Sequence, residues 1–357
     1  MGRARELTVG DRTIGHGHPA YVIAEIGVNH DGSLERALTL VDEAAHAGAD
    51  AVKFQTFDPA ALAVGSAPLA DYQQAGTSGV STQLEMLTAL ALSASDFRVL
   101  ATRCSELGVD FLSTPFDEPS AELLIGLGVP ALKIGSGELT NTPFLAHCGA
   151  LGVPVLLSTG MATELEIDAA LTAVRRSGND AVVLLHCVSS YPTPVSEANL
   201  LAIVTLRERF GVPVGYSDHC LGLDVSLAAI ALGSTVLERH ITLDRELLGP
   251  DHAISLLPSE LRELIDRTRA IESALGDGVK APREVEANTR QVARRSLVAA
   301  RDLEPGHVVA LADIAAKRPA GGLTPARRDD LVGATLTRGI RADEPFTPAD
   351  VDGGATG

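Results

Sequence analysis

The chain has 357 residues and a formal net charge of −17, and 45% of its residues are hydrophobic. This length exceeds what one hydrophobic core usually supports, so we expect one large domain and a smaller one. The acidic balance argues against nucleic acid or an acidic membrane as a partner, because the basic surface that binds them is missing. Residues 1–12 are polar and no apolar run reaches about 18 residues, which predicts a cytoplasmic protein that does not cross a membrane.

Between residues 21 and 275, short apolar runs alternate regularly with amphipathic segments. The predicted strands are residues 21–27, 51–57, 109–116, 131–137, 154–160, 181–188, 212–217 and 234–242. The predicted helices include residues 33–47, 95–107, 163–176, 197–210 and 258–275. Eight strand–helix units in about 250 residues predict an α/β fold, a closed (β/α)8 TIM barrel. A doubly wound open sheet is the alternative, but its Gly-x-Gly-x-x-Gly motif is missing after the first strand.

A stretch rich in glycine, proline and charge, residues 276–288, follows the last predicted helix. Beyond it, short β-like pieces at residues 296–300, 308–310, 334–337 and 345–346 predict a compact, β-rich second domain. We therefore divide the chain into a barrel domain at 1–280, a linker at 281–292 and a small domain at 293–357. The small domain is too small for independent catalysis, and we expect it to cover or complete the site of the barrel.

Only four of the 29 lysine and arginine residues are lysines, and two of these, Lys53 and Lys133, lie inside apolar, strand-like runs. A buried pair of ammonium groups indicates contacts with an anion. Hydroxyl groups near the ends of other predicted strands would complete a cradle for a phosphate and a carboxylate: Thr114, Ser136, Ser158 and Ser217. The competing hypothesis is a Schiff base, because a buried lysine with a lowered pKa is the usual imine nucleophile.

Histidines follow or end the last two predicted strands, where the chemistry of a barrel collects. His219 and His240 lie at adjacent strand ends, so both could reach one cation. With a carboxylate such as Glu25 and with water, they would form an open site of the Mn²⁺ or Mg²⁺ kind. Two structural histidines are the alternative, and His186 is a third candidate.

Nine motifs along the predicted barrel resemble those of the sialic acid (N-acetylneuraminate) synthase family. They are residues 24–32 (AEIGVNHDG), 52–55 (VKFQ), 113–117 (STPFD), 133–138 (KIGSGE), 158–161 (STGM), 186–194 (HCVSSYPTP), 215–219 (GYSDH), 238–242 (ERHIT) and 249–252 (GPDH). Residues 294–297 (RRSL) and 317–319 (KRP) resemble the antifreeze-like (SAF) domain that ends such enzymes. The resemblance covers essentially the whole chain, in order.

The resemblance implies a metal-dependent condensation of phosphoenolpyruvate with an N-acetylmannosamine-like aldose and water, which gives a nine-carbon 2-keto-3-deoxy sugar acid and phosphate. It implies that phosphoenolpyruvate is held by Lys53, Thr114, Lys133, Ser136, Ser158, Ser189 and Ser217. It implies that His219 and His240 bind Mn²⁺ or Mg²⁺, and that the sugar contacts Gln55, Glu138, Tyr191 and Asp251. The candidates for acid–base catalysis are then Glu25, Glu138 and His186.

The resemblance also implies a domain-swapped homodimer, in which the antifreeze-like domain docks on the other protomer's barrel and Arg318 reaches the sugar. Residues 58–81 resemble a loop that carries a Tyr-Gln pair, here Tyr72 and Gln73, and are expected to form a lid. The acceptor stays open between N-acetylmannosamine and a 6-deoxy diacetamido hexose, and residues 25–30 favour the sialic or legionaminic branch over the pseudaminic one. Two other classes of function are kept: an imine-forming barrel aldolase or lyase acting on a keto acid, and a noncatalytic sugar-binding barrel.

Overall fold

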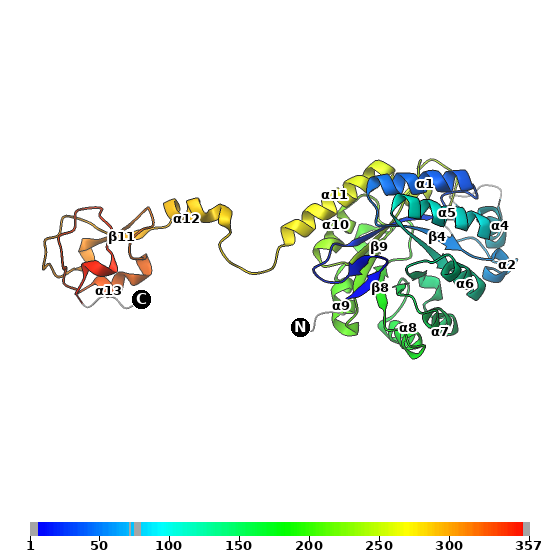
Figure 1. Ribbon diagram of the computed structural model, residues 1–357, viewed down its shortest axis with the longest axis horizontal. Helices are drawn as coiled ribbons and strands as arrows, with labels where there is room; N and C mark the ends of the chain where they lie inside the picture. Colours follow the sequence, from blue (N-terminus) through cyan, green and yellow to red (C-terminus); the bar gives the residue numbers. More distant parts are fainter. Residues whose placement is uncertain (1–5, 71–72, 75–79, 353–357) are drawn as a thin grey trace. The chain divides into compact units, whose positions relative to one another are not determined.

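The computed structural model describes residues 6–70, 73–74 and 80–352, which divide into two compact units, Met1–Gly276 and Asp277–Gly357. The N-terminal unit is built on eight parallel strands with helices around them (Figure 1). The strands are β3 (Tyr21–Gly27), β4 (Ala51–Thr56), β5 (Asp110–Pro115), β6 (Leu132–Ile134), β7 (Val155–Ser158), β8 (Val182–Cys187), β9 (Val214–Asp218) and β10 (Val236–His240).

The eight strands form one sheet in the order β5-β4-β3-β10-β9-β8-β7-β6. The two end strands, β5 and β6, also lie beside each other, so the sheet curls into a barrel. The predicted TIM barrel is therefore confirmed. Strand β6 is shorter than predicted, because residues Ser136–Glu138 form a turn of 3-10 helix instead of extending the strand.

Helices follow the strands and cover the outside of the barrel (Figure 1). They are α1 (Leu34–Ala47), α2 (Pro59–Leu62), α4 (Gln83–Leu90), α5 (Ala94–Leu107), α6 (Glu118–Gly126), α7 (Thr142–Ala150), α8 (Glu164–Arg176), α9 (Leu201–Phe210), α10 (Asp224–Ala231) and α11 (Pro258–Leu275). Capping boxes at Ser93 and Thr163 begin α5 and α8, and Gly48 and Gly108, with φ of 93° and 70°, end α1 and α5.

Two apolar layers hold the barrel together. The larger lies between strands and helices and includes the outward side chains of the strands, such as Val22, Leu184 and Leu237. The smaller fills the interior of the barrel, where the hairpin of β1 (Leu7–Val9) and β2 (Arg12–Ile14) contributes Val9 and Ile14. The sequence did not predict this hairpin. Because apolar side chains fill this interior layer, the polar groups are left to the carboxyl ends of the strands.

The C-terminal unit is a small domain around the antiparallel pair β11 (Ser296–Ala299) and β12 (Ile314–Lys317). Its helices are α12 (Ala287–Ala293) and α13 (Arg328–Leu331), and its core includes Leu297, Leu331 and Phe346. The predicted pieces at 308–310, 334–337 and 345–346 pair only as isolated bridges. Within the described part of the chain, no helix is both long and apolar enough to cross a membrane.

Candidate active site

The side chains that point into the barrel change from apolar to charged toward the carboxyl ends of the strands. On β3, Tyr21 and Ile23 belong to the interior cluster, and Glu25 occupies the next inward position. On β10, Val236 belongs to the same cluster, and Glu238 follows it inward. Successive side chains of a strand point to opposite faces, so this placement follows from the two-residue period.

The same alternation assigns the inward side chains of the other strands. Ala51, Leu112, Ala131, Leu156 and Leu185 lie in the interior cluster. Counting two or four residues on from them gives the inward set: Lys53 and Gln55 on β4, Thr114 on β5, Lys133 on β6, Ser158 on β7 and Cys187 on β8. Thus several predicted site residues from different strands face the same space at one end of the barrel.

Lys53 is held by groups from three strands. Its Nζ lies 2.6 Å from Glu25 Oε2 and 3.9 Å from Glu238 Oε2, and it donates a hydrogen bond of 3.1 Å to Thr114 Oγ1. Gln55 Nε2 donates to the other Glu25 oxygen at 3.3 Å. Lys53 is only 3% exposed, so its charge is balanced inside the protein.

Lys133 lies near the other carboxylate oxygen of Glu238. Its Nζ donates to Ser158 Oγ at 2.7 Å and lies 3.6 Å from Glu238 Oε1, which also accepts a 3.0 Å hydrogen bond from Ser217 Oγ. Glu238 therefore lies between the two ammonium groups. Its other oxygen, Oε2, is buried without a hydrogen-bond partner in the part of the chain that the structure describes.

The charges of this cluster shift one another's pKa values. Burial raises the pKa of Glu25 to about 7, against the opposing effect of Lys53. The pKa of Glu238 is lowered, since Lys133 and Lys53 outweigh its burial. Burial likewise lowers the pKa of Lys133, whereas the carboxylates of Glu238 and Glu25 outweigh burial at Lys53 and raise its pKa. The two lysines thus differ, and Glu25 titrates near neutral pH.

Neutral donors converge beside the lysines around Gly160. Its backbone N–H donates to Ser136 Oγ at 3.0 Å, and Ser136 Oγ lies 3.2 Å from Cys187 Sγ. A Cβ atom at position 160 would lie 2.3 Å from Ser189 Oγ and 2.8 Å from Ser136 Oγ. Glycine is therefore required for the two serines to come together, and the structure brings Ser189 to the same group as Ser136.

His219 and His240 lie side by side, with ring centroids 5.5 Å apart. His219 Nδ1 donates to the Val188 carbonyl at 2.9 Å, so in the neutral ring Nε2 carries the lone pair, and the rings of Tyr191 and His219 pack with centroids 4.3 Å apart. His240 Nδ1 lies 3.7 Å from Asp251 Oδ2 and is buried without a hydrogen-bond partner among the described residues. Burial lowers the pKa of both histidines, which favours the neutral imidazole that binds metal ions.

The histidine pair fits an open metal site better than a closed one. No group of three or more His, Cys, Asp or Glu side chains within residues 6–70, 73–74 and 80–352 is arranged to hold a metal ion. Two neutral imidazoles still suit a cation whose other ligands are water or substrate oxygens, and one of them has a buried nitrogen with no hydrogen-bond partner in the described part of the chain.

Two predicted catalytic residues are held by other partners than the lysines. His186 is on the outward side of β8, where Nε2 contacts the Ala198 carbonyl at 2.9 Å and the ring packs on Tyr216. The inward position at this end of β8 is Cys187. Glu138 is half-buried on the 3-10 turn after β6 and accepts a 2.8 Å hydrogen bond from Asn141 Nδ2.

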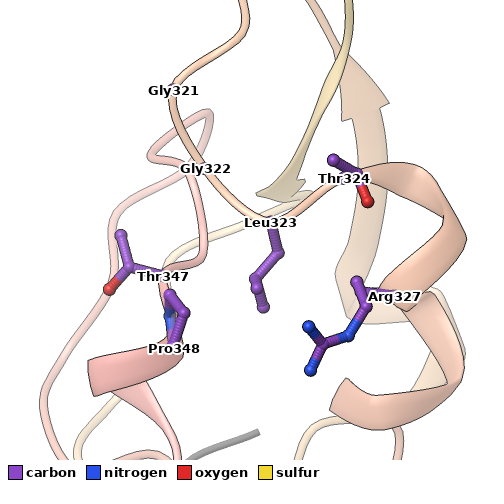
Figure 2. A pocket seen from close by; sticks show the side chains of 7 residues that line it. All are labelled: Gly321, Gly322, Leu323, Thr324, Arg327, Thr347 and Pro348. Atoms are coloured by element: carbon purple, nitrogen blue, oxygen red, sulfur yellow. The ribbon is translucent and has the colours of Figure 1, made fainter. Parts of the chain in front are cut away.

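Arg318 and the Tyr-Gln pair of the expected lid were also predicted to serve the site. Arg318 is an exposed residue of the C-terminal unit, directly after β12. Gln73 Oε1 accepts a hydrogen bond of 2.9 Å from the Ala70 backbone, and Tyr72 lies outside the described residues. The C-terminal unit also has a pocket of about 300 Å³, shown in Figure 2. It is lined by Gly321, Gly322, Leu323, Thr324, Arg327, Thr347 and Pro348.

The sequence analysis gave Glu238 no role, although this residue begins the motif at residues 238–242. Its signal was its position two residues before His240 on a predicted strand, which gives both side chains the same face. Behind this face, Arg239 and Asp218 form a fully buried ion pair with Nη1 and Oδ2 2.6 Å apart, and Ser226 of α10 donates to the same carboxylate. This pair ties β9 to β10 and to the helix layer.

Comparisons with known proteins agree with this architecture. Residues 40–280 match the model of the NeuB family, and residues 294–352 match that of the SAF domain. The N,N'-diacetyllegionaminic acid synthase of Legionella pneumophila is 42% identical over 346 residues, which are 96% of this chain and 97% of that protein. The protein of the same name from Campylobacter jejuni is 41% identical, over 90% of this chain and 97% of that protein.

Solved structures give the same result for the fold. The N-acetylneuraminic acid synthetase of Leptospira borgpetersenii is 35% identical with a TM-score of 0.72, over 80% of this chain and 95% of that one. A truncated 3-deoxy-D-arabino-heptulosonate 7-phosphate synthase of Thermotoga maritima is 17% identical with a TM-score of 0.61, and this likeness concerns the fold alone.

Proposed function

This chain belongs to the NeuB family and ends in a SAF domain, and on that premise we propose that it is a nonulosonate synthase. It condenses phosphoenolpyruvate with an N-acetylated aldose and water, giving a nine-carbon 2-keto-3-deoxy sugar acid and phosphate. The observation that carries the proposal is the pair of buried lysines, Lys53 and Lys133, on either side of Glu238 at the carboxyl end of the barrel.

Phosphoenolpyruvate would bind between the two lysines and the neutral donors beside them. A trianionic ligand needs more than one cation, and Lys53 and Lys133 are both 3% exposed, so their attraction is little screened by water. The neutral donors of the proposed cradle are the side chains of Thr114, Ser136, Ser158, Ser189 and Ser217, of which Thr114 and Ser158 already contact the lysines. Lys53 stays protonated for this role, because its pKa is raised by Glu238 and Glu25 against its burial.

His219 and His240 would hold a divalent cation, Mn²⁺ or Mg²⁺. When bound, the ion would supply Lewis-acid polarisation of the aldehyde of the acceptor. The chain's own residues orient this site: Val188 fixes the tautomer of His219, and Tyr191 packs on its ring.

The reaction forms a bond between carbon 3 of the enol and the aldehyde carbon, and the aldehyde oxygen takes up a proton. Water then adds at carbon 2 and gives up one proton, which balances the proton taken up by the aldehyde oxygen. The bond between carbon 2 and the phosphate oxygen breaks, phosphate leaves with its electrons and takes up the second proton of the water, and carbon 2 becomes the keto group. Glu25 is suited to move a proton at its carboxylate, since its pKa of about 7 lies near the working pH. Gln55 and Lys53 hold that carboxylate in place. Glu138 stays a candidate sugar contact at the rim.

For the acceptor we propose an N-acetylated aldose of the sialic or legionaminic branch. Two relatives named N,N'-diacetyllegionaminic acid synthase are 42% and 41% identical, whereas a Campylobacter jejuni protein named pseudaminic acid synthase is 33% identical. Gln55, Tyr191 and Asp251 are the proposed contacts of the sugar in the barrel. Because phosphoenolpyruvate is a metabolite of the cytoplasm, we also propose the cytoplasm as the working compartment.

We further propose a domain-swapped homodimer in which the partner's SAF domain brings its copy of Arg318 to the sugar. Large hydrophobic side chains are exposed in the segments that follow β7, β8, β9 and β10, and they support a docked partner at the carboxyl end of the barrel. They are Met161, Leu165, Val195, Leu201, Leu221 and Leu248. Sedimentation gives the oligomeric state, and an assay at the same protein concentration gives the activity. A protein that sediments as a monomer and is fully active would contradict the dimer.

The decisive experiment is a phosphate-release assay with phosphoenolpyruvate, Mn²⁺ and a panel of aldoses. The panel contains N-acetylmannosamine and 6-deoxy diacetamido hexoses, and His219→Ala serves as the control for metal dependence. We expect phosphate release with at least one N-acetylated aldose and its loss with EDTA. Absence of release with every aldose would contradict the synthase and favour a noncatalytic sugar-binding barrel.

One observation favours a second candidate, an imine-forming aldolase. Burial lowers the pKa of Lys133, and such a lysine is a better nucleophile than an ordinary one. Borohydride with pyruvate would trap an imine at Lys133 only in this second case. We prefer the synthase, because an imine enzyme has no need for a second buried lysine or for the histidine pair.

A further inference from the structure

Two loops meet at the carboxyl end of the barrel beside the proposed acceptor site. The first, residues 28–33, joins β3 to α1, and the second, residues 241–257, follows β10 and carries Asp251. Asp251 is 7% exposed, and its Oδ2 lies 3.7 Å from His240 Nδ1. The position of this carboxylate therefore depends on what holds the second loop.

The first attachment starts from Asn29, which is 1% exposed. Its Nδ2 donates two hydrogen bonds of 2.9 Å, to the Ile241 carbonyl and to Ser255 Oγ. Ser255 Oγ in turn donates to the backbone carbonyl of Asp251 at 2.7 Å. One hydroxyl therefore connects the first loop to the backbone of Asp251.

The second attachment runs through His252, whose side chain is fully buried. Its Nε2 lies 3.1 Å from Asp31 Oδ1, and its Nδ1 lies 2.7 Å from Thr242 Oγ1. A carboxylate only accepts, so Nε2 carries a proton and donates to Asp31. The hydroxyl of Thr242 lies between His252 Nδ1 and the Asp244 carbonyl, to which it donates at 3.0 Å. Asp31 also pairs with Arg36 of α1, which anchors it to the helix layer.

Gly249 packs closely against the contact between His252 and Asp31. A Cβ atom there would lie 2.6 Å from His252 Cδ2 and 3.1 Å from Asp31 Oδ1. The loop thus packs tightly on the histidine and its carboxylate partner, two residues before Asp251 in the sequence.

We propose that Asp31 and His252 are positioning residues that hold Asp251 in the acceptor site and so set the affinity for the aldose without touching it. This inference rests on the proposed function, in which Asp251 contacts the aldose. The inference predicts different effects on the affinities for the two substrates. The attachments hold a residue that contacts the aldose, whereas phosphoenolpyruvate is bound by Lys53 and Lys133, which lie on other strands.

The test is Asp31→Asn in the full-length enzyme. Asp31 has a φ of 49°, a conformation that asparagine tolerates, so the substitution removes the charge without straining the loop. We expect the KM for the aldose to rise about 10-fold, the effect of losing one charge-assisted hydrogen bond, with the KM for phosphoenolpyruvate changed less than about 2-fold. The matched control is Asp42→Asn on α1, which removes a comparable partner of Arg103 with Oδ1 and Nε 2.7 Å apart and should leave both KM values unchanged.

A double substitution shows whether Asp31 acts through Asp251. If it does, Asp31→Asn adds less than about 2-fold to the effect of Asp251→Asn on the aldose KM, because the carboxylate that it positions is already gone. Effects that multiply, or equal losses for both substrates, would overturn the proposal.

Hydrogen exchange tests the attachment without relying on activity. We expect amides of residues 242–255 to exchange about 10-fold faster in Asp31→Asn and to be unchanged in Asp42→Asn. Unchanged exchange in Asp31→Asn would overturn the inference even if the synthase activity is found. If the wild-type enzyme releases no phosphate with any aldose, the proposed function is contradicted. Hydrogen exchange alone then decides whether Asp31 holds the second loop.

Discussion

Glu25 and Lys53 lie opposite each other on the neighbouring strands β3 and β4, with Oε2 and Nζ 2.6 Å apart inside the barrel. The positive charge of Lys53, which is proposed to bind an anion, is thus already balanced by the Glu25 carboxylate in the protein without ligand. Such an arrangement keeps a buried ammonium protonated at a tolerable cost in stability. It also means that removal of either residue takes away the nearest counter-charge of the other.

Lys53→Met is expected to abolish binding of phosphoenolpyruvate. It removes one of two cations from the cradle and leaves Glu25 and Glu238 with less compensation, so we expect the free energy of unfolding to fall by about 3 kcal/mol as well. Calorimetric titration with phosphoenolpyruvate measures the first effect and urea unfolding the second. Lys280→Met is the matched control, because Lys280 is exposed before α12. Wild-type affinity in Lys53→Met would refute the anion cradle.

His240→Ala should abolish Mn²⁺ binding, whereas His186→Ala should not. Among the residues that the structure describes, His240 Nδ1 has no hydrogen-bond partner and its ring lies next to His219, whereas His186 points outward and contacts the Ala198 carbonyl. Free Mn²⁺ in equilibrium with each variant, followed by electron paramagnetic resonance, gives the affinity. Equal loss in the two variants would mean that the outward histidine matters to the metal site and that the assignment from strand geometry fails.

Gly160→Ala should weaken phosphoenolpyruvate binding selectively. The new methyl group would lie 2.3 Å from Ser189 Oγ and 2.8 Å from Ser136 Oγ, so the two hydroxyls must move apart. We expect the KM for phosphoenolpyruvate to rise about 10-fold or more, from the loss of one or two hydrogen bonds. Gly137→Ala is the control, because a Cβ atom there meets nothing within 4 Å. If both variants behave alike, the serine group has no part in binding.

The sequence predicted the barrel because eight apolar runs alternate with helices at a regular spacing. It could not predict which face of β8 enters the barrel. Residues Val182–Cys187 are buried on both faces, so no polar alternation marks the inward side, and His186 was chosen where Cys187 faces inward. On β10 the pattern is readable, since Glu238 and His240 share a face, yet only the histidine received a role.

The short N-terminal hairpin escaped prediction for a different reason. Its strands, Leu7–Val9 and Arg12–Ile14, have three residues each, too few for an alternating pattern to stand out. The attachments of Asp251 also depend on contacts between residues more than 200 positions apart, such as Asn29 and Ile241, which no local pattern contains.

The C-terminal unit should lose stability at acid pH through one buried carboxylate. Asp313 is 2% exposed and accepts hydrogen bonds from His307, the Ala310 backbone and Arg301, which lower its pKa to about 2. A carboxyl whose pKa is lower in the folded state contributes stability that is present above its unfolded pKa of about 3.9. That contribution is lost as the pH falls through about 2.

Asp313→Asn is therefore expected to be less stable at neutral pH and to lack this part of the acid dependence. The expected loss at pH 7 is about 1–3 kcal/mol, since buried donors lose a charged acceptor. Urea unfolding of the full chain at pH 2 to 7, with pulsed hydrogen exchange of residues 294–352 as the readout, isolates the C-terminal unit from the barrel. Asp343→Asn, at an exposed pair with Lys317, controls for the change in net charge and should cost little. The same slope with pH in Asp313→Asn as in the wild type would show that another group carries the acid sensitivity.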